Sequence, residues 1–380
     1  MPVGGAGARD PGGGEARIRL GSRWTGGLPS PRAVSSRGRG AGAPLRSFLL
    51  RAGTPVTGPM SSPAGHDRSP GEAVENRPPV GVLVLGMHRS GTSAATRLVN
   101  LLGPSLCIRS DLMTGNTSNV KGFWESRSLM RTNNLLLSEM GRKWWFPPSP
   151  EVLRQWEDDV ADATVDAARS AFVRAHPTEP WVWKDPRTCL TLSFWRHALV
   201  RPVAGIVVHR NPLDIARSLE QRNHMDPEYS SALWMRYMRL LLEQAGGMPL
   251  LVTGYDGLLE DPVGWSDAVR TFLGDLGMPV AAQLDHASIS AFVDPTLRHS
   301  TEHAPDAGPT AALYDVLRSL DGVHPSFVVP ALGAEAPWIE ERLAEVGPEW
   351  HPTWRNPAAE PPTAGARMRS LWRRTPFVKN

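Results

Sequence analysis

The fold follows from one segment, Val80-Gly-Val-Leu-Val-Leu-Gly-Met-His-Arg-Ser-Gly-Thr-Ser93. Its first six residues, 80–85, form a short apolar run rich in β-branched side chains, which predicts a buried strand. From Thr92 to Leu102 apolar residues recur at helical spacing. A glycine-bearing loop therefore joins a strand to the N-terminus of a helix. This arrangement predicts an anion site, because loop N–H groups and the positive end of the helix dipole face the same point.

The loop partly matches the phosphate-binding pattern G-x-x-x-x-G-K-[ST]. Gly86 and Gly91 have the required separation, and Ser93 occupies the Ser/Thr position. The lysine position, however, holds Thr92, and a cation occurs three residues earlier at Arg89. The phosphate cradle is thus predicted without the lysine that reaches a γ-phosphate. An ordinary strand-to-helix turn and a degenerate nucleotide loop are the alternative interpretations.

The run Arg89-Ser90-Gly91-Thr92-Ser93 resembles the 5′-phosphosulfate-binding loop of sulfotransferases. In that family a basic residue precedes Ser-Gly-Thr-[Ser/Thr]. The resemblance implies that these five residues bind the donor 3′-phosphoadenylyl sulfate. Within them, it implies that Arg89 clamps the phosphosulfate and that Thr92 and Ser93 hold the 5′-phosphate.

A second charged segment is Trp181-Val-Trp-Lys-Asp-Pro-Arg187. Its tryptophans and valine predict a short buried strand that ends at Lys184-Asp185. In open α/β sheets the carboxyl ends of strands carry the ligand site, which favours a functional role for these charges. A surface cluster of Lys184, Asp185 and Arg187 is the alternative interpretation.

A third segment repeats the order of strand, loop and helix. Residues 203–209 predict a strand, and Arg210 follows it, with Ser218 eight residues later in a predicted helix. This pair resembles the 3′-phosphate-binding segment of sulfotransferases, and it can offer one phosphate a forked donor and a hydroxyl. Arg298, in a late basic loop, is a weaker match to a further contact with that phosphate.

The resemblance extends over residues 80–299, and the Lys184-Asp-Pro element looks closest to the tyrosylprotein and related bacterial branch. It implies an α/β fold, a three-layer P-loop-type fold with a central parallel sheet flanked by helices. It also implies sulfuryl transfer to a hydroxyl or amine of a glycan, glycolipid, small metabolite or peptide. A P-loop kinase or NTPase and a non-catalytic nucleotide-binding module are the alternatives.

Three residues are candidates for the base that removes the acceptor's proton. Glu125 follows a glycine-bearing loop at a predicted helix start, and the related branch uses a glutamate in this region. A favourable interaction with the helix dipole is the other explanation for its position. His88 has the more suitable ordinary pKa, and Asp185 is the third candidate. Arg89 and Lys184 would stabilise the charge of the transferred group and its bridging oxygen.

Apolar periodicity predicts the remaining elements of the chain. They are a strand at 249–253 and helices at about 125–140, 151–175, 228–245, 262–276, 309–320 and 338–346.

Composition divides the 380 residues into three parts. Residues 1–77 contain 16 Gly, 9 Pro and 11 Arg against 5 acids, and they predict a disordered tail with a charge of +6. The whole chain carries only +3, so the basic balance is not in the predicted sulfotransferase domain at 78–350, which argues against a nucleic-acid partner. Residues 351–380 predict a Pro-rich basic tail. Translation from Met60 rather than Met1 stays open.

Cysteine content and hydropathy lead to expectations about the compartment. Two cysteines form no disulfide framework, and no Cys/His spacing typical of a metal site occurs. No apolar run approaches the roughly 18 residues of a membrane span. We therefore expect a cytoplasmic enzyme without a metal cofactor. The oligomeric state stays open.

Overall fold

The structure of the protein is a computed structural model, which describes residues 78–113, 115, 122–293 and 308–350. The predicted tails at 1–77 and 351–380 lie outside the described residues. Both alternative initiating methionines, Met1 and Met60, and Arg298 also lie outside them. The predictions made for them therefore stay predictions.

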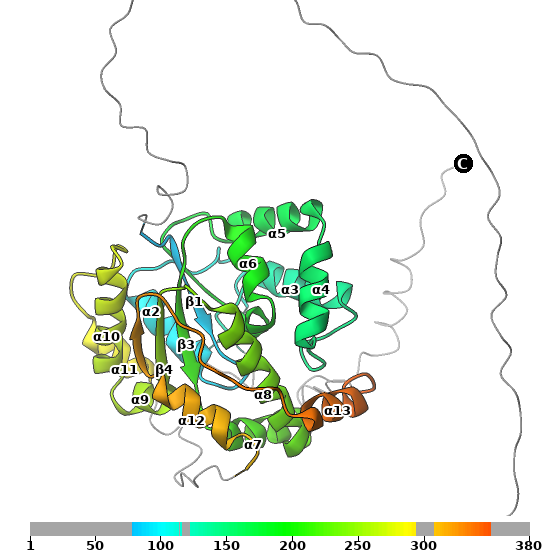
Figure 1. Cartoon of the computed structure of the whole chain (residues 1–380). Helices are drawn as coiled ribbons and strands as arrows, with labels where there is room; N and C mark the ends of the chain where they lie inside the picture. The colour runs from blue at the N-terminus through cyan, green and yellow to red at the C-terminus, as the bar shows by residue number, and fades with distance from the viewer. Residues whose placement is uncertain (1–77, 114, 116–121, 294–307, 351–380) are drawn as a thin grey trace, which may run out of the picture. The chain divides into compact units, whose positions relative to one another are not determined.

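Five strands form one sheet in the order β2-β1-β3-β4-β5 (Figure 1). The first four are parallel, and β5 runs antiparallel to β4. The three strands at one side of this order, β2, β1 and β3, are buried along their whole length, because helices cover both faces of the sheet. The strands are β1 (Gly81–Leu85), β2 (Trp181–Lys184), β3 (Ala204–His209), β4 (Leu250–Gly254) and β5 (Gly322–His324).

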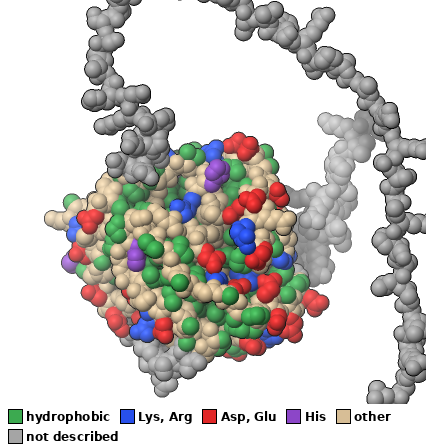
Figure 2. Space-filling view, in the orientation of Figure 1, with side chains coloured by type: hydrophobic (Ala, Val, Ile, Leu, Met, Phe, Trp, Pro, Cys, Tyr) green, Lys and Arg blue, Asp and Glu red, His purple; other side chains and the backbone are tan. Residues whose placement is uncertain are grey.

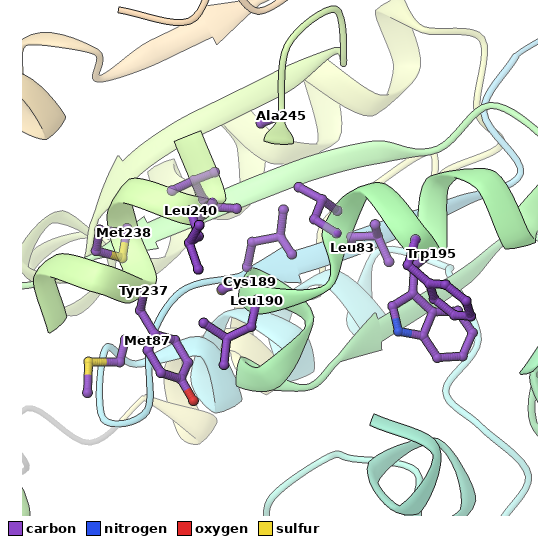
Figure 3. Close-up of a cluster of buried hydrophobic side chains, with 14 of the residues drawn as sticks. Leu83, Met87, Cys189, Leu190, Trp195, Tyr237, Met238, Leu240 and Ala245 are labelled. Atoms are coloured by element: carbon purple, nitrogen blue, oxygen red, sulfur yellow. The ribbon is translucent and has the colours of Figure 1, made fainter. Parts of the chain in front are cut away.

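Alternating side chains of the strands enter two separate hydrophobic cores. Leu83 and Leu85 of β1 belong to one core, and Val82 and Val84 belong to the other. The alternation follows from the two-residue period of a strand. Figure 3 shows part of the first core, in which Leu83 meets side chains from the segments after β2 and β3.

The helices form two layers, one on each side of the sheet (Figure 1). Helices α2, α9, α10 and α11 contribute to the core of Val82, whereas α3, α5, α6 and α8 contribute to the core of Leu83. The predicted three-layer α/β class is therefore confirmed. The helices are α2 (Thr92–Leu101), α3 (Arg127–Glu139), α4 (Pro150–Asp159), α5 (Asp162–Ala175), α6 (Leu192–Leu199), α7 (Pro212–Asn223), α8 (Pro227–Gln244), α9 (Tyr255–Glu260), α10 (Pro262–Asp275), α11 (His286–Phe292), α12 (Ala311–Ser319) and α13 (Pro337–Val346), with the 3-10 helix η1 (Pro186–Leu190).

The single helix predicted at 151–175 was wrong, because the chain forms α4 and α5 there. Val160 and Ala161 separate the two helices in extended conformation. Asp158 and Asp159 lie at the carboxyl end of α4, where negative charge opposes the helix dipole, whereas Asp162 lies in the first turn of α5, where it is favourable.

The sheet contains one strand that the sequence did not predict. Strand β5 has three residues, and only Val323 in it is apolar, so no alternating pattern marks it. It pairs with β4 through Leu251 and Val323, and it makes the sheet mostly rather than wholly parallel.

Candidate functional site

The candidate site lies where the loops after β1, β2 and β3 meet. These strands are neighbours and parallel, so their carboxyl ends share one edge of the sheet. The loop after β1 leads to α2 on one face, whereas the loops after β2 and β3 lead to helices on the other face. Such a divergence of connections is where open α/β sheets bind ligands.

The loop after β1 has the backbone conformation of an anion cradle. Gly86 and Gly91 have φ values of 147° and 90°, and Arg89 has 73°. A Cβ at Gly91 would lie 2.0 Å from the ring of Tyr255, so this position requires glycine. Gly91 is also the N-cap of α2 and provides no side-chain cap. The Oγ of Ser90 is buried and has no hydrogen-bond partner in the described part of the chain.

The structure brings Arg89, Arg210 and Ser218 together. Arg89 Nε donates to Ser218 Oγ at 2.7 Å, and Arg210 Nη1 donates to the backbone oxygen of Arg89 at 3.3 Å. Arg210 also lies over the Tyr255 ring, 5.3 Å from its centroid. Burial, with the charges of Arg222 and Arg210, lowers the pKa of Arg89 to about 10. The excess of positive charge at this point favours an anionic ligand.

Lys184 and Glu125 form a buried ion pair beside the first loop. Lys184 Nζ donates to Glu125 Oε1 at 2.6 Å and to Ser93 Oγ at 3.1 Å. The exposed fractions of the Lys184 and Glu125 side chains are 2% and 9%. Removing such a pair from water costs about as much as its attraction returns, so stability alone does not account for it. The pair places a carboxylate and a cation at one point next to the predicted phosphate loop.

Glu125 is not a cap of the following helix. Ser126 is the N-cap of α3, and its Oγ accepts from Leu129 N. The carboxylate of Glu125 points instead to Lys184. Glu125 precedes this cap by one residue, so the helix dipole stays an alternative explanation beside the ion pair.

Asp185 has a structural role. Its Oδ1 accepts from the backbone N–H of Arg187 and from Arg187 Nη1, and its Oδ2 accepts from Asn133 Nδ2 at 3.0 Å. The amide oxygen of Asn133 is also bonded, because Oδ1 accepts from Trp195 Nε1 at 2.7 Å. The three charged residues Lys184, Asp185 and Arg187 are all buried, so their interpretation as a surface cluster was wrong.

His88 lies within the cluster of cations. Its ring centroid is 4.6 Å from that of Trp144. Burial lowers its pKa well below the ordinary value, and the charges of Arg187, Arg222, Lys184 and Arg89 lower it further. The imidazole is therefore neutral at pH 7. The surrounding positive charge opposes its protonation, so it is a weaker candidate for the base than Glu125.

Comparison with known proteins gives little further guidance. No family model and no curated protein sequence matches the chain. A sulfotransferase domain from the olefin synthase of Synechococcus PCC 7002 superposes with a TM-score of 0.32 at 19% identity, covering 71% of this chain and 94% of that domain. A sulfotransferase domain from the curacin biosynthetic pathway gives 0.32 at 13% identity, with 71% and 97% covered. Similarity this weak assigns no role to any residue.

Arg222 is the site residue that the sequence motifs missed. It lies on α7 near Glu125 and Arg187, whose charges affect its pKa. A signal for it existed in the four-residue spacing of Ser218 and Arg222, which places both on one face of a helix.

The described residues contain neither a membrane-spanning helix nor a metal-binding cluster of side chains. No helix among them is long and apolar enough to cross a bilayer. No group of three or more His, Cys, Asp or Glu in the same ranges could hold a metal ion. On the face shown in Figure 2, basic side chains are scattered among acidic and hydrophobic ones and form no continuous basic area.

Proposed function

We propose that the protein is a sulfotransferase, which moves a sulfuryl group from 3′-phosphoadenylyl sulfate to a hydroxyl or amine of an acceptor. The observation that carries this proposal is the Lys184–Glu125 pair, held 3.1 Å from Ser93 of the glycine loop through Lys184 Nζ. It combines a base and a cation at the point where the predicted phosphate loop ends.

The residues of the loop fit the donor. Ser90 Oγ and Arg210 Nε are buried and without hydrogen-bond partners among the described residues, so both can donate to a ligand. In this proposal the loop and the first turn of α2 hold the 5′-phosphosulfate. Arg210 and Ser218 hold the 3′-phosphate, with Arg298 as a predicted further contact.

The catalytic residues divide the chemistry between them. The donor supplies the sulfuryl group, whose bond to the phosphate oxygen breaks while its bond to the acceptor oxygen forms. Glu125 takes the acceptor's proton, and its hydrogen bond from Lys184 holds the carboxylate in position for that task. Lys184 and Arg89 stabilise the charge on the leaving phosphate. Removing one preorganised donor of this kind costs about 10²–10³ in rate.

The kinase or NTPase alternative is less well supported by the geometry. Such an enzyme needs an acidic Mg²⁺ ligand at a strand end. Asp185 is the acid at the end of β2, and Arg187 and Asn133 already occupy its oxygens. A non-catalytic binding module would have the same contacts as the enzyme, so turnover distinguishes the two.

Calorimetric binding of adenosine 3′,5′-bisphosphate and of ADP tests the donor. We expect the wild type to prefer the bisphosphate and Arg210→Ala to lose that preference, while Arg217→Ala behaves as wild type. Arg217 is the matched control, because it lies on the same helix with its side chain 59% exposed. Equal binding of ADP, strengthened by Mg²⁺, would instead indicate an ordinary nucleotide enzyme.

A further inference from the structure

Arg222 is a cation that the proposed donor site does not use. It lies one helical turn after Ser218, on the same face of α7. Its Nε is buried without a hydrogen-bond partner, and it forms no ion pair with any carboxylate in the described part of the chain. Leaving a buried donor without a partner is costly, and a bound ligand is one explanation for such a group.

Two further unpartnered donors lie in the surroundings of Arg222. His88 Nε2 and Arg187 Nε are both buried and have no hydrogen-bond partner among the described residues. Arg222 and Arg187 both lower the pKa of His88, in addition to the effect of burial. Burial lowers the pKa of Arg222 itself, and the charge of Arg187 adds to that effect while Glu125 opposes it. The three side chains thus form a group of mutually repelling or unpaired donors.

Among the described residues, carboxylates compensate this group only in part: the charges of Asp185 and Glu125 raise the pKa of Arg187, whereas Arg222 has no ion pair. Glu125 is the nearby acid, and Lys184 occupies it at 2.6 Å. Asp185 binds Arg187 through Nη1 and leaves the Nε of Arg187 without a partner. An anion from outside the chain would complete the arrangement.

The group lies near the proposed base, Glu125, whose charge acts on Arg222 and Arg187, and the charge of Arg222 also acts on Arg89. The ring of His88 packs against Trp144 at 4.6 Å and against Tyr237 of α8 at 6.0 Å between centroids. Its neighbour Arg89 turns instead to Ser218 and the nucleotide loop. His88 therefore packs against aromatic side chains, and the charge of the proposed base, Glu125, acts on Arg187 and Arg222.

We propose that Arg222, with Arg187 and His88, binds an oxyanion that the acceptor itself carries. The acceptor is then a hydroxylated acid, with a carboxylate, phosphate or sulfate near the reacting hydroxyl, and not a neutral sugar or alcohol. This inference rests on the proposed function, because it takes Glu125 as the group that faces the acceptor hydroxyl. Arginine suits the role because its planar fork matches an oxyanion with two donors.

The test is calorimetric titration of inorganic sulfate into the full-length protein saturated with adenosine 3′,5′-bisphosphate. We expect the wild type to bind sulfate and Arg222→Gln to bind it at least tenfold more weakly. Arg222→Lys should retain part of the affinity, and Arg217→Gln, on the exposed side of α7, should retain all of it. The affinity for the bisphosphate, measured first, should change less than threefold in Arg222→Gln, and thermal unfolding checks that each variant is folded.

Two other outcomes overturn the inference, and a third contradicts the proposed function instead. Equal loss of bisphosphate and sulfate binding in Arg222→Gln would assign Arg222 to the nucleotide. Sulfate binding that Lys184→Met abolishes and Arg222→Gln leaves unchanged would place the ion at the transferred group. Failure of the wild type to bind the bisphosphate contradicts the proposed function alone, and the same titration without nucleotide then tests the anion site.

Discussion

Two arginines, the buried Arg236 and the half-buried Arg222, differ in how their charge is compensated. Arg236 of α8 has a partner for each guanidinium nitrogen: Nε and Nη2 donate to Glu335, Nη2 also to Glu340, and Nη1 to the backbone oxygen of Pro148. Arg222 of α7 has none of these contacts, and its Nε is buried without a partner among the described residues.

The pKa values of the two arginines change in opposite directions. Burial lowers the pKa of both, but the hydrogen bonds that Arg236 donates to Glu335 and Glu340 outweigh burial and raise the pKa of Arg236. The pKa of Arg222 stays lowered. Arg236 is stabilised because two carboxylates, those of Glu335 and Glu340, accept its hydrogen bonds. At the sheet edge Lys184, Arg187 and Arg210 also have carboxylate partners. Arg222 has no ion pair among the described residues, which fits a site for an anion.

The largest predicted effect concerns the proposed base. Glu125→Gln should lower turnover of 3′-phosphoadenylyl sulfate about 10²–10⁴-fold, because the amide cannot take a proton. Bisphosphate affinity should stay within a few-fold of wild type. The measurement is release of adenosine 3′,5′-bisphosphate with a panel of hydroxylated acceptors.

Glu335→Gln is the control for this substitution. Glu335 also pairs with a buried cation, Arg236, but it lies outside the candidate site. It should leave turnover unchanged. Full turnover by Glu125→Gln would remove Glu125 from the role of base.

The second effect is on stability and concerns the ion pairs of Arg236 with Glu335 and Glu340. Arg236→Met should lower the free energy of unfolding by about 2–3 kcal/mol, since breaking a buried pair leaves its partner uncompensated. The loss is smaller than for a fully buried pair, because Glu340 is 49% exposed and water screens it. Urea unfolding measures the effect. A loss of equal size in Arg222→Met would mean that the two arginines have the same role.

The third effect is a pH dependence of the free energy of unfolding that arises from His88. The pKa of His88 is lower in the folded protein than its ordinary value of 6.5, so the unfolded chain binds its proton first as pH falls. The contribution of neutral His88 to the free energy of unfolding is fully present above pH 6.5. Below that pH the contribution decreases by up to about 1.4 kcal/mol per pH unit. His88→Gln should lack this contribution. Urea unfolding of both proteins between about pH 7.5 and 5.5 should give converging curves, and parallel curves would contradict the burial of a neutral imidazole.

The smallest effect comes from Asp226, the N-cap of α8, which pairs with Arg342 of α13. Burial raises the pKa of Asp226, but bonds from the backbone N–H of Tyr229 and from Arg342 outweigh it, so the folded pKa is below 3.8. Its contribution is therefore present above pH 3.8 and is lost as pH falls through the folded pKa. Asp226→Asn should destabilise the protein slightly at pH 7 and progressively less in acid. A difference that grows in acid would reverse the sign of this assignment.

Local pattern predicted most of the elements and part of the site. The strands at 80–85 and 203–209 and the helix at 228–245 occur within one or two residues of their predicted bounds, because their apolar residues are continuous or strictly periodic. The break at Val160 and the strand β5 were missed. The break depends on charge at a helix end, and β5 on pairing with a distant strand.

The sequence by itself determined the α/β class, the glycine loop and the choice of Arg89, Lys184 and Arg210 as candidate cations. These depend on residue types and on spacings of a few positions, which local sterics and periodicity control. Only the tertiary structure decided which groups meet. Lys184 and Glu125 are 59 positions apart, and their contact requires β2 to lie beside β1 and the start of α3 to return to that edge. The unpaired state of Arg222 is likewise a property of its surroundings, because a missing partner leaves no pattern in the chain.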